Sequence, residues 1–248
     1  MRFFMNLSYR GAPFHGWQIQ PGAISVQEVI EKALSTLAGE KVAVTGAGRT
    51  DAGVNAHLMT AHFDYAKEPD ATLLRSLNSL CGPDIAIHDI RRVADDAHAR
   101  FDATERTYRY YCTTAKNPFA RGLAWKAPAS LSFEAMNEAA AMLLGVRDFT
   151  SFAKLHTDVK TNICDLRHAA WHRMDNDAWY FEITADRFLR NMVRAVVGTL
   201  VDVGRGKMPP QAIIDILEQR NRCAAGTSMP AEALYLWDVK YPEGIYLE

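Results

Sequence analysis

One order of secondary-structure signals occurs twice along the chain, and this repeat constrains the fold more than any other feature. Its first copy opens with alternating apolar residues, which indicate a half-buried strand. Ser25 and Glu28 then have capping-box spacing, and apolar residues recur at helical intervals until Gly39. The expected elements are a strand at 2–9, a helix from 25 to 39, strands at 42–45 and 59–65, a helix from 70 to 82 and a strand at 85–93. This order, β-α-β-β-α-β, is that of the ferredoxin-like fold.

The second copy begins near residue 107. It is expected to contain a strand at 107–114, a helix from 132 to 145, a hairpin of 168–174 and 179–184, a helix at 188–203, a short helix after 209–210 and a strand at 234–241. We therefore predict an α/β (α+β) fold with two ferredoxin-like or RRM-like halves and mixed, mainly antiparallel sheets. The halves are expected at 1–103 and 104–248, and without an extended linker they should share an active-site cleft.

Composition excludes some classes of protein and leaves others open. Lys and Arg total 28 against 29 for Asp and Glu, so an RNA partner would require basic groups segregated on one face. No apolar run is long enough to span a bilayer. The four cysteines are scattered, which favours reduced, mostly buried thiols and a cytoplasmic location. No metal site is predicted, because no carboxylate or thiol completes a ligand pattern with His57 and His62.

The segment 46–54 is the most informative for chemistry. Three glycines in eight residues permit backbone angles and close approaches that side chains would block, which suits a loop that grips a ligand. Arg49 and Asp51 are two residues apart, so both can project to one side of an extended chain, where the cation would favour the ionised carboxylate. The spacing alone also fits a surface turn with a structural ion pair. A phosphate-binding loop is disfavoured, because the G-x-x-x-x-G-K-[ST] pattern is missing.

These residues nevertheless carry a resemblance that extends over nearly the whole chain. The run from Gly46 to Gly53 resembles the signature of the tRNA pseudouridine synthase A family, in which the aspartate of G-R-T-D-A-G is catalytic. Further matches in the family's order are Ser25-Val26-Gln27-Glu28, His98-Ala99-Arg100-Phe101, Tyr108-Arg109-Tyr110, Asp148-Phe149-Thr150-Ser151-Phe152, Met192-Val193-Arg194 and Leu234-Tyr235-Leu236.

The resemblance implies a role for several residues. Asp51 would be the catalytic carboxylate and Arg49 its partner in the loop. Tyr108 would contact the target uracil, Arg194 would pair with the carboxylate, and Leu234 would form the apolar wall of the base pocket. The chain departs from the family pattern where Asn55 replaces a frequent His and Ala233 a frequent Gly, which puts details of tRNA contact in doubt but not the reaction.

The function implied is isomerisation of uridine to pseudouridine at positions 38, 39 and 40 of the tRNA anticodon stem and loop, without a cofactor, by a homodimer. Two other classes compete. A non-catalytic RNA-binding module is disfavoured because the RNP1 run is absent and an Asp-centred loop is present. A metal-dependent nuclease needs clustered carboxylates, and the loop has one.

Arginines supply the expected surface for the RNA backbone. On the helix expected near 188–203, the basic side chains cluster apart from the apolar face, and a second basic group surrounds the boundary between the halves. The loop 9–20 can either touch tRNA or pack on the protein. A solvated charged face is the alternative for each single group. The candidates are Arg10, Arg100, Arg106, Arg187 and Arg190.

Overall fold

Contacts divide the chain into two units, and the computed structural model describes residues 1–154 and 161–247. Unit 1 comprises Met1–Thr104 and Tyr235–Glu248, and unit 2 comprises Glu105–Leu234. Helices and strands are mixed in both units, and most strand pairs are antiparallel. The predicted mixed α/β fold with mainly antiparallel sheets is therefore confirmed.

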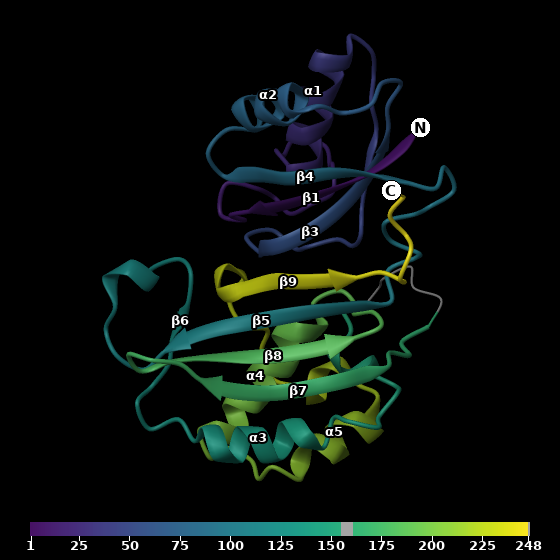
Figure 1. Ribbon diagram of the computed structural model, residues 1–248. Coiled ribbons are helices and arrows are strands. Elements are labelled where there is room, and N and C mark those ends of the chain that lie inside the picture. The colour runs from purple at the N-terminus through teal and green to yellow at the C-terminus, as the bar shows by residue number, and fades with distance from the viewer. Residues whose placement is uncertain (155–160, 248) are drawn as a thin grey trace. The chain divides into compact units, whose positions relative to one another are not determined.

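Unit 1 has the predicted order β-α-β-β-α-β, followed by a last strand from the end of the chain (Figure 1). Its elements are β1 (Arg2–Tyr9), α1 (Val26–Ala38), β2 (Val44–Gly46), β3 (Asn55–Asp64), α2 (Ala71–Cys81), β4 (Ile85–Val93) and β9 (Leu234–Lys240). The strands lie in the order β4-β1-β3-β9, and β2 also pairs with β3. Only β9 joins this sheet in parallel, through Asn55 opposite Tyr235 and Ala56 opposite Leu236.

The helices of unit 1 begin and end where their capping residues predict. The Ser25 side chain accepts a hydrogen bond from the backbone N–H of Glu28, and Gly39 adopts a left-handed φ of 73° that ends α1. Asp70 caps α2 in the same way, by accepting from the N–H of Leu73 at 2.8 Å. Local capping contacts therefore define the N-terminal ends of both helices.

The first strand differs from prediction in one respect, because both of its faces are buried. Met5 and Leu7 have no exposed surface, as the alternating pattern predicts, but Phe4 on the opposite side is equally buried. The C-terminal segment covers that side, with Tyr241 and Tyr246 packed on the Phe4 ring at centroid distances of 5.0 and 6.0 Å. A segment more than 230 residues away thus completes the core around β1.

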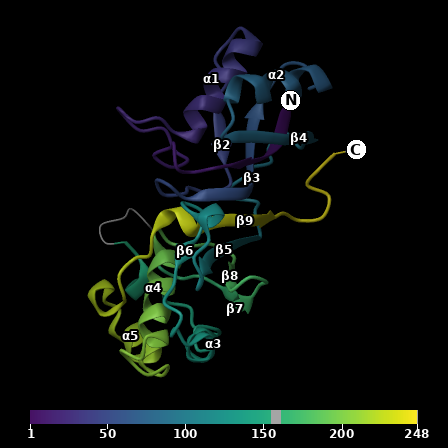
Figure 2. The ribbon, with the colours of Figure 1, turned by 90° about the vertical axis from the view of Figure 1, so that its left-hand side faces the viewer.

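Unit 2 is built on the sheet order β5-β8-β7, with β6 paired to β5. Its elements are β5 (Glu105–Thr113), η1 (Pro118–Ala120), β6 (Trp125–Lys126), α3 (Phe133–Ala141), η2 (Thr150–Phe152), β7 (Leu166–Arg173), β8 (Ala178–Ala185), α4 (Met192–Gly204), α5 (Ala212–Gln219), η3 (Arg222–Ala224) and η4 (Ala231–Ala233). The helices gather on one side of these strands in both ribbon views (Figures 1 and 2). Trp171 and Phe181 are buried, and Trp171 packs edge-on against Phe133 of α3. The other face of the three strands carries half-buried polar and aromatic side chains.

Three sequence expectations are corrected. The strand predicted at 59–65 begins at Asn55, because that residue pairs with β9. The helix predicted at 188–203 begins at Met192, because Asn191 has a left-handed φ of 66°. Arg187 and Arg190 therefore precede α4 and do not share a helical face with Arg194.

The limits predicted for the two halves also differ from the observed units. The first boundary, at Thr104, lies beside the expected 103, but residues 235–248 belong to unit 1 and not to the half expected at 104–248. Pairing of β9 with β3 is the cause.

The four cysteines are free thiols, and three of them are buried. Burial raises the pKa of Cys81 to about 11 and the pKa of Cys112 to about 12. Only Cys223 is exposed. None of the helices in the described ranges combines the length and apolarity needed to cross a bilayer.

Candidate active site

The glycine-rich loop of unit 1 runs from the end of β2 to the start of β3. Its first residue, Ala47, donates its N–H to the carbonyl of Thr60 on β3 at 2.8 Å, which ties the loop to the sheet. In the middle of the loop Thr50 is buried, and its Oγ1 lies 2.8 Å from the hydroxyl of Tyr9 on β1. The loop is thus anchored both at its base and at its centre.

A second loop, residues 10–20, packs on the first. The N–H of Trp17 donates to the carbonyl of Thr50 at 3.2 Å, and its indole is buried. A Cβ on Gly46 would lie 2.5 Å from Trp17 Cε2, so only glycine permits this approach. Phe14 is also buried. Of the two alternatives for this loop, its aromatic residues therefore support packing on the protein, while Arg10 is exposed.

Asp51 and Arg49 lie on either side of the buried Thr50. Asp51 is half-buried and Arg49 is exposed. The expectation that both side chains project to the same side of the chain stays a prediction. The N–H of Val54 donates to the carbonyl of Asp51 at 3.1 Å, so the backbone that carries the carboxylate is closed into a turn. The carboxylate is therefore held on a rigid support and partly shielded from water.

Asn55 has a structural role that sequence reasoning missed. It is 2% exposed, and its Oδ1 accepts a hydrogen bond from the N–H of Gly11 at 2.8 Å. The backbone of Gly11 lies so close to that of Val54 that a Cβ on Gly11 would be 2.2 Å from the carbonyl oxygen of Val54. The residue that replaces the family's frequent His thus joins the two loops, and no local sequence signal marks it, because its partner Gly11 lies far away in the chain.

His62, next to the site loop on β3, is a buried histidine held neutral. It lies opposite Thr45 of β2, and its Nδ1 accepts the N–H of Ala99 at 3.1 Å. Burial lowers the pKa of His62 to about 4, and the positive charges of His98 and Arg2 act in the same direction. This contact fixes the segment 98–101 against the strand that follows the loop.

In unit 2, Tyr108 lies on β5 opposite Ile183 of β8. It is half-buried, and its ring meets Phe188 edge-on at a centroid distance of 5.1 Å. Phe188 lies in the segment between β8 and α4 that was expected to be helical. The contact makes an aromatic pair beside β5, and aromatic side chains of this kind can stack on a base.

Arg194 lies in the first turn of α4 and holds a neighbouring segment in place. Its Nε donates to the carbonyl of Met229 at 2.6 Å, and the N–H of Met229 donates to the carbonyl of Arg194 at 3.1 Å. Further along α4, a Cβ on Gly198 would lie 1.8 Å from the carbonyl oxygen of Thr227. The segment that leads to Leu234 is therefore pressed against the helix, and Leu234 itself is 5% exposed.

Tyr110 is a buried group that sequence reasoning did not assign. Its side chain is fully buried, and its hydroxyl has no hydrogen-bond partner among the described residues. Burial raises the pKa of Tyr110, the charge of Glu232 raises it further, and Arg194 lowers it. The charges of Arg194 and Glu232 therefore both act on this phenol.

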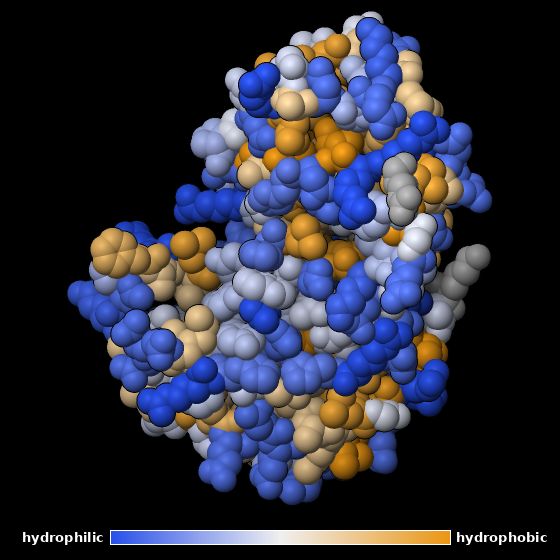
Figure 3. All heavy atoms as spheres, viewed as in Figure 1, coloured by the Kyte–Doolittle hydropathy of each residue, from blue (hydrophilic) through white to orange (hydrophobic). Residues whose placement is uncertain are grey.

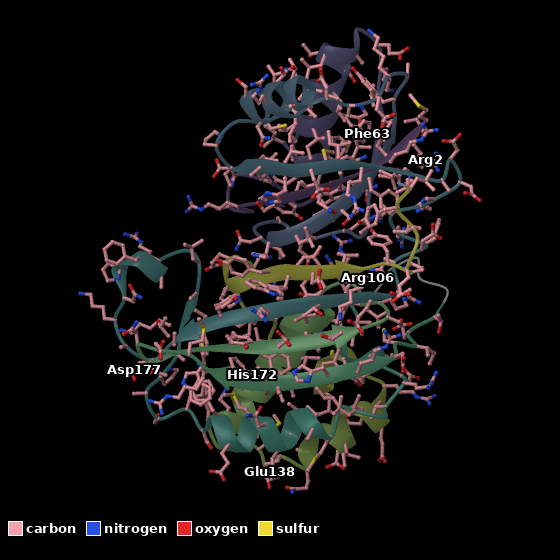
Figure 4. All side chains as sticks on the ribbon, viewed as in Figure 1. Arg2, Phe63, Arg106, Glu138, His172 and Asp177 are labelled. Atoms are coloured by element: carbon pink, nitrogen blue, oxygen red, sulfur yellow. The ribbon has the colours of Figure 1, made fainter. Side chains whose placement is uncertain are left out.

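The five arginines expected to bind the RNA backbone are divided between the units. Arg10 and Arg100 belong to unit 1 and are exposed. Arg106, marked in Figure 4, donates to the backbone carbonyl of Asp186 at 2.8 Å. Arg187 is half-buried and Arg190 is exposed in the turn before α4.

Each unit therefore carries its own part of the predicted site. In unit 1 the loop holds Arg49 and Asp51. In unit 2 Tyr108 lies on β5 and Arg194 on α4, and Leu234, the first residue of β9, is the last residue of the unit. The cleft expected between the halves stays a prediction.

Comparison with known proteins identifies the family. A family model described as tRNA pseudouridine synthase matches residues 139–242. The tRNA pseudouridine synthase A of Bacteroides thetaiotaomicron is 56% identical over 250 residues, covering 100% of this chain and 93% of that protein. The enzyme of the same name from Bacteroides fragilis is also 56% identical, covering 99% of this chain and 98% of its own length. A solved Cbf5-Nop10-Gar1 complex matches with a TM-score of 0.31 and 11% identity, covering 80% of this chain and 54% of its own, which is too remote to support an argument.

These matches define the class of protein, which is tRNA pseudouridine synthase. The chain belongs to the tRNA pseudouridine synthase A family. The prediction that it is an isomerase that makes pseudouridine in tRNA is confirmed.

Proposed function

We propose that this enzyme isomerises uridine at positions 38, 39 and 40 in the anticodon stem and loop of tRNA, with Asp51 as its catalytic carboxylate. One observation carries the assignment of Asp51. The carboxylate projects from a loop whose backbone is fixed by the buried Thr50 and by the Trp17 indole on Gly46. A catalytic group must be held in place in this way, because small displacements are costly to the rate.

The reaction breaks the bond from ribose C1′ to N1 of uracil, turns the base and forms a bond from C1′ to C5. C5 gives up its proton and N1 gains one, so the product is an isomer of the substrate. A carboxylate can act as a nucleophile at C1′, which gives a covalent intermediate, or as a base that removes the C2′ proton. Both routes use the carboxylate of Asp51 in a position that is partly shielded from water, and the half-buried position of the residue supplies that shielding. Neither route consumes a cofactor.

The uridine must leave its stack before it can react, at a cost of a few kcal/mol. We assign Tyr108 to the face of the flipped uracil and Leu234 to the apolar wall of its pocket. The edge-on contact with Phe188 restricts the Tyr108 ring. Contacts of residues 226–229 with α4 hold the segment that leads to Leu234. Arg194 is proposed as the cation that stabilises negative charge on the catalytic carboxylate, with Arg49 as a second cation in the loop.

The remaining assignments rest on the family relationship. Two ferredoxin-like halves would enclose the active-site cleft, and two copies of the chain would form a homodimer in the cytoplasm. Arginine guanidinium groups suit phosphate contacts because they remain charged and present several donors. The residues assigned to the RNA backbone are Arg10, Arg100, Arg106, Arg187 and Arg190.

The test is to incubate the protein with unmodified tRNA transcript in the presence of EDTA and to map pseudouridine. Product is expected at positions 38–40, unaffected by chelation. The variant Asp51→Asn should lose turnover while it keeps tRNA affinity within about two-fold, because the amide replaces the carboxylate with almost no change of volume. Asp96→Asn, at an exposed aspartate, is the matched control.

The alternative, a non-catalytic RNA-binding module, would bind the transcript and leave every uridine unchanged. Normal turnover of Asp51→Asn would instead remove Asp51 from the chemistry. Modification confined to other regions of tRNA would contradict the proposed positions.

A further inference from the structure

The open face of the sheet in unit 2 carries a cluster of histidine and carboxylate side chains on neighbouring strands. Along β7, Ala169 and Trp171 point toward the helices and are buried, whereas His168 and His172 lie on the other side and are half-buried. Glu182 of β8 shares that outer face and is also half-buried. Figure 3 shows a mainly hydrophilic surface over these strands, and Figure 4 marks His172 on β7.

The two histidines are four residues apart on one strand, yet their ring nitrogens meet. The Nε2 atoms of His168 and His172 lie 3.4 Å apart, and the rings are nearly parallel, with an interplanar angle of 19°. Only the methyl group of Ala170 stands between them on this face, which lets both rings lean inward. The sheet register sets Glu182 directly opposite Ala170, so its carboxylate reaches toward the same space.

The distance between the two histidine nitrogens matches that of ligands that share one metal ion, and the Glu182 carboxylate lies further away, so its side chain must shift toward the histidines to reach the same ion. Ligand atoms about 2.0–2.1 Å from a tetrahedral Zn²⁺ lie roughly 3.3–3.4 Å from one another. The separation of the two Nε2 atoms fits this without movement. An oxygen of Glu182, Oε1, lies 3.8 Å from His168 Nε2, and one ligand atom from each of the three residues falls within 4.8 Å of the others.

We propose that His168, His172 and Glu182 form a binding site for a borderline divalent transition-metal ion such as Zn²⁺. Two imidazoles and one carboxylate are a ligand set that Zn²⁺ accepts, and water would complete its coordination. The ion links β7 to β8 on the face opposite the helices. It is separate from the isomerase chemistry, which needs no metal.

The carboxylate is already oriented for this role by its other oxygen. Glu182 Oε2 accepts a hydrogen bond from Nε of Arg109 at 2.6 Å, which leaves Oε1 on the histidine side. Arg109 in turn stacks over the Tyr180 ring at 4.6 Å, and Tyr180 stacks on His172 at 5.0 Å. Such outer contacts hold metal ligands in position. The charge of Arg109 also offsets that of Glu182, so the affinity should be lower than that of a closed four-ligand zinc site.

A hydrogen bond between the two imidazoles is the competing explanation for the 3.4 Å contact. It requires one ring to donate from Nε2 and the other to accept there. That arrangement gives the same distance between the two Nε2 atoms but predicts no binding of an added metal ion. The two explanations therefore differ in a direct binding experiment.

The experiment uses the untagged full chain with Cys223→Ser, because that exposed thiol can bind metal by itself. Zn²⁺ binding is measured by calorimetry, and Co²⁺ is used as a spectroscopic probe of coordination geometry. We expect one equivalent of either ion to bind, a tetrahedral Co²⁺ absorption spectrum and a higher melting temperature with Zn²⁺, since an ion bound only by the folded state stabilises it. His168→Gln and His172→Gln should each weaken binding by about 100-fold or more.

The matched control is His88→Gln, which removes a histidine that is exposed in unit 1 and should leave Zn²⁺ affinity unchanged. Far-UV circular dichroism of each variant checks that the sheet remains folded. The proposal fails if the parent protein gives no tetrahedral Co²⁺ spectrum, or if His168→Gln and His88→Gln bind Zn²⁺ equally well. Pseudouridine formation in EDTA is a separate measurement. The metal-site proposal and the isomerase assignment can therefore fail independently of each other.

Discussion

Acidification should destabilise this enzyme through His62, and the size of the effect follows from its surroundings. The side chain is 8% exposed on β3, and its Nδ1 accepts the N–H of Ala99. Burial lowers the pKa of His62 in the folded state from 6.5 to about 4. A proton therefore binds more tightly to the unfolded chain than to the folded one, so stability is present above pH 6.5 and is lost as the pH falls toward 4.

The magnitude comes from the difference between the two pKa values. At 1.36 kcal/mol per unit, the difference between the two pKa values limits the total loss of stability to about 3 kcal/mol, which is reached once the pH lies below both pKa values. Between about pH 7.5 and pH 5 the expected loss from this one histidine is about 2 kcal/mol, because the folded state still resists protonation at pH 5.

The assay is urea unfolding of the wild-type protein and of His62→Asn at both pH values. The asparagine Oδ1 can take the place of Nδ1 as acceptor for Ala99 but does not titrate. The variant should lose about 2 kcal/mol less than the wild type on acidification. His88→Asn, at an exposed histidine, should behave like the wild type. An equal loss in the wild type and in His62→Asn would refute the reasoning.

The other predictions concern close packing near the two parts of the site, and each is checked by urea unfolding. Gly46→Ala should lower the free energy of unfolding by about 1–3 kcal/mol, since its Cβ would meet the indole packed there, whereas Gly48→Ala, which has open space, should cost much less. Gly198→Ala should destabilise by at least as much as Gly46→Ala, because its Cβ would meet the carbonyl of Thr227. Tyr9→Phe should cost about 1–2 kcal/mol, because it leaves the buried hydroxyl at the centre of the site loop without this partner. No change for Gly198→Ala or Tyr9→Phe would contradict the corresponding contact.

Much of this enzyme was readable from its sequence because the relevant signals are local. Capping residues such as Ser25 and Asp70 act over three residues, and the structure has both caps. The β-α-β-β-α-β order of unit 1 follows from apolar periodicity in the same way. The loop that carries Asp51 was found from its own composition, and its likeness to one family identified the reaction.

The sequence-based predictions were wrong where contacts between distant segments determine the structure. Asn55 is part of β3 because β9, almost 180 residues later, pairs with it, and this pairing also puts the chain's last strand in unit 1. Phe4 is buried because residues near the C-terminus cover it. In these cases the deciding partner is far away in sequence, so a short window carries no signal for it.

The sequence also did not predict single backbone angles or the register between neighbouring strands. Asn191 adopts a left-handed conformation that delays α4, although the apolar pattern continues through it. His168 and His172 look unrelated along the chain, and only the register that places Glu182 opposite the residue between them makes a cluster. The sequence alone therefore determined most of the elements and their caps, and it singled out the loop that carries Asp51, since these depend on neighbours within a few residues. Only the tertiary structure decided which strands pair, which faces of the sheets are covered and which side chains meet across neighbouring strands. These contacts join segments that no local pattern connects.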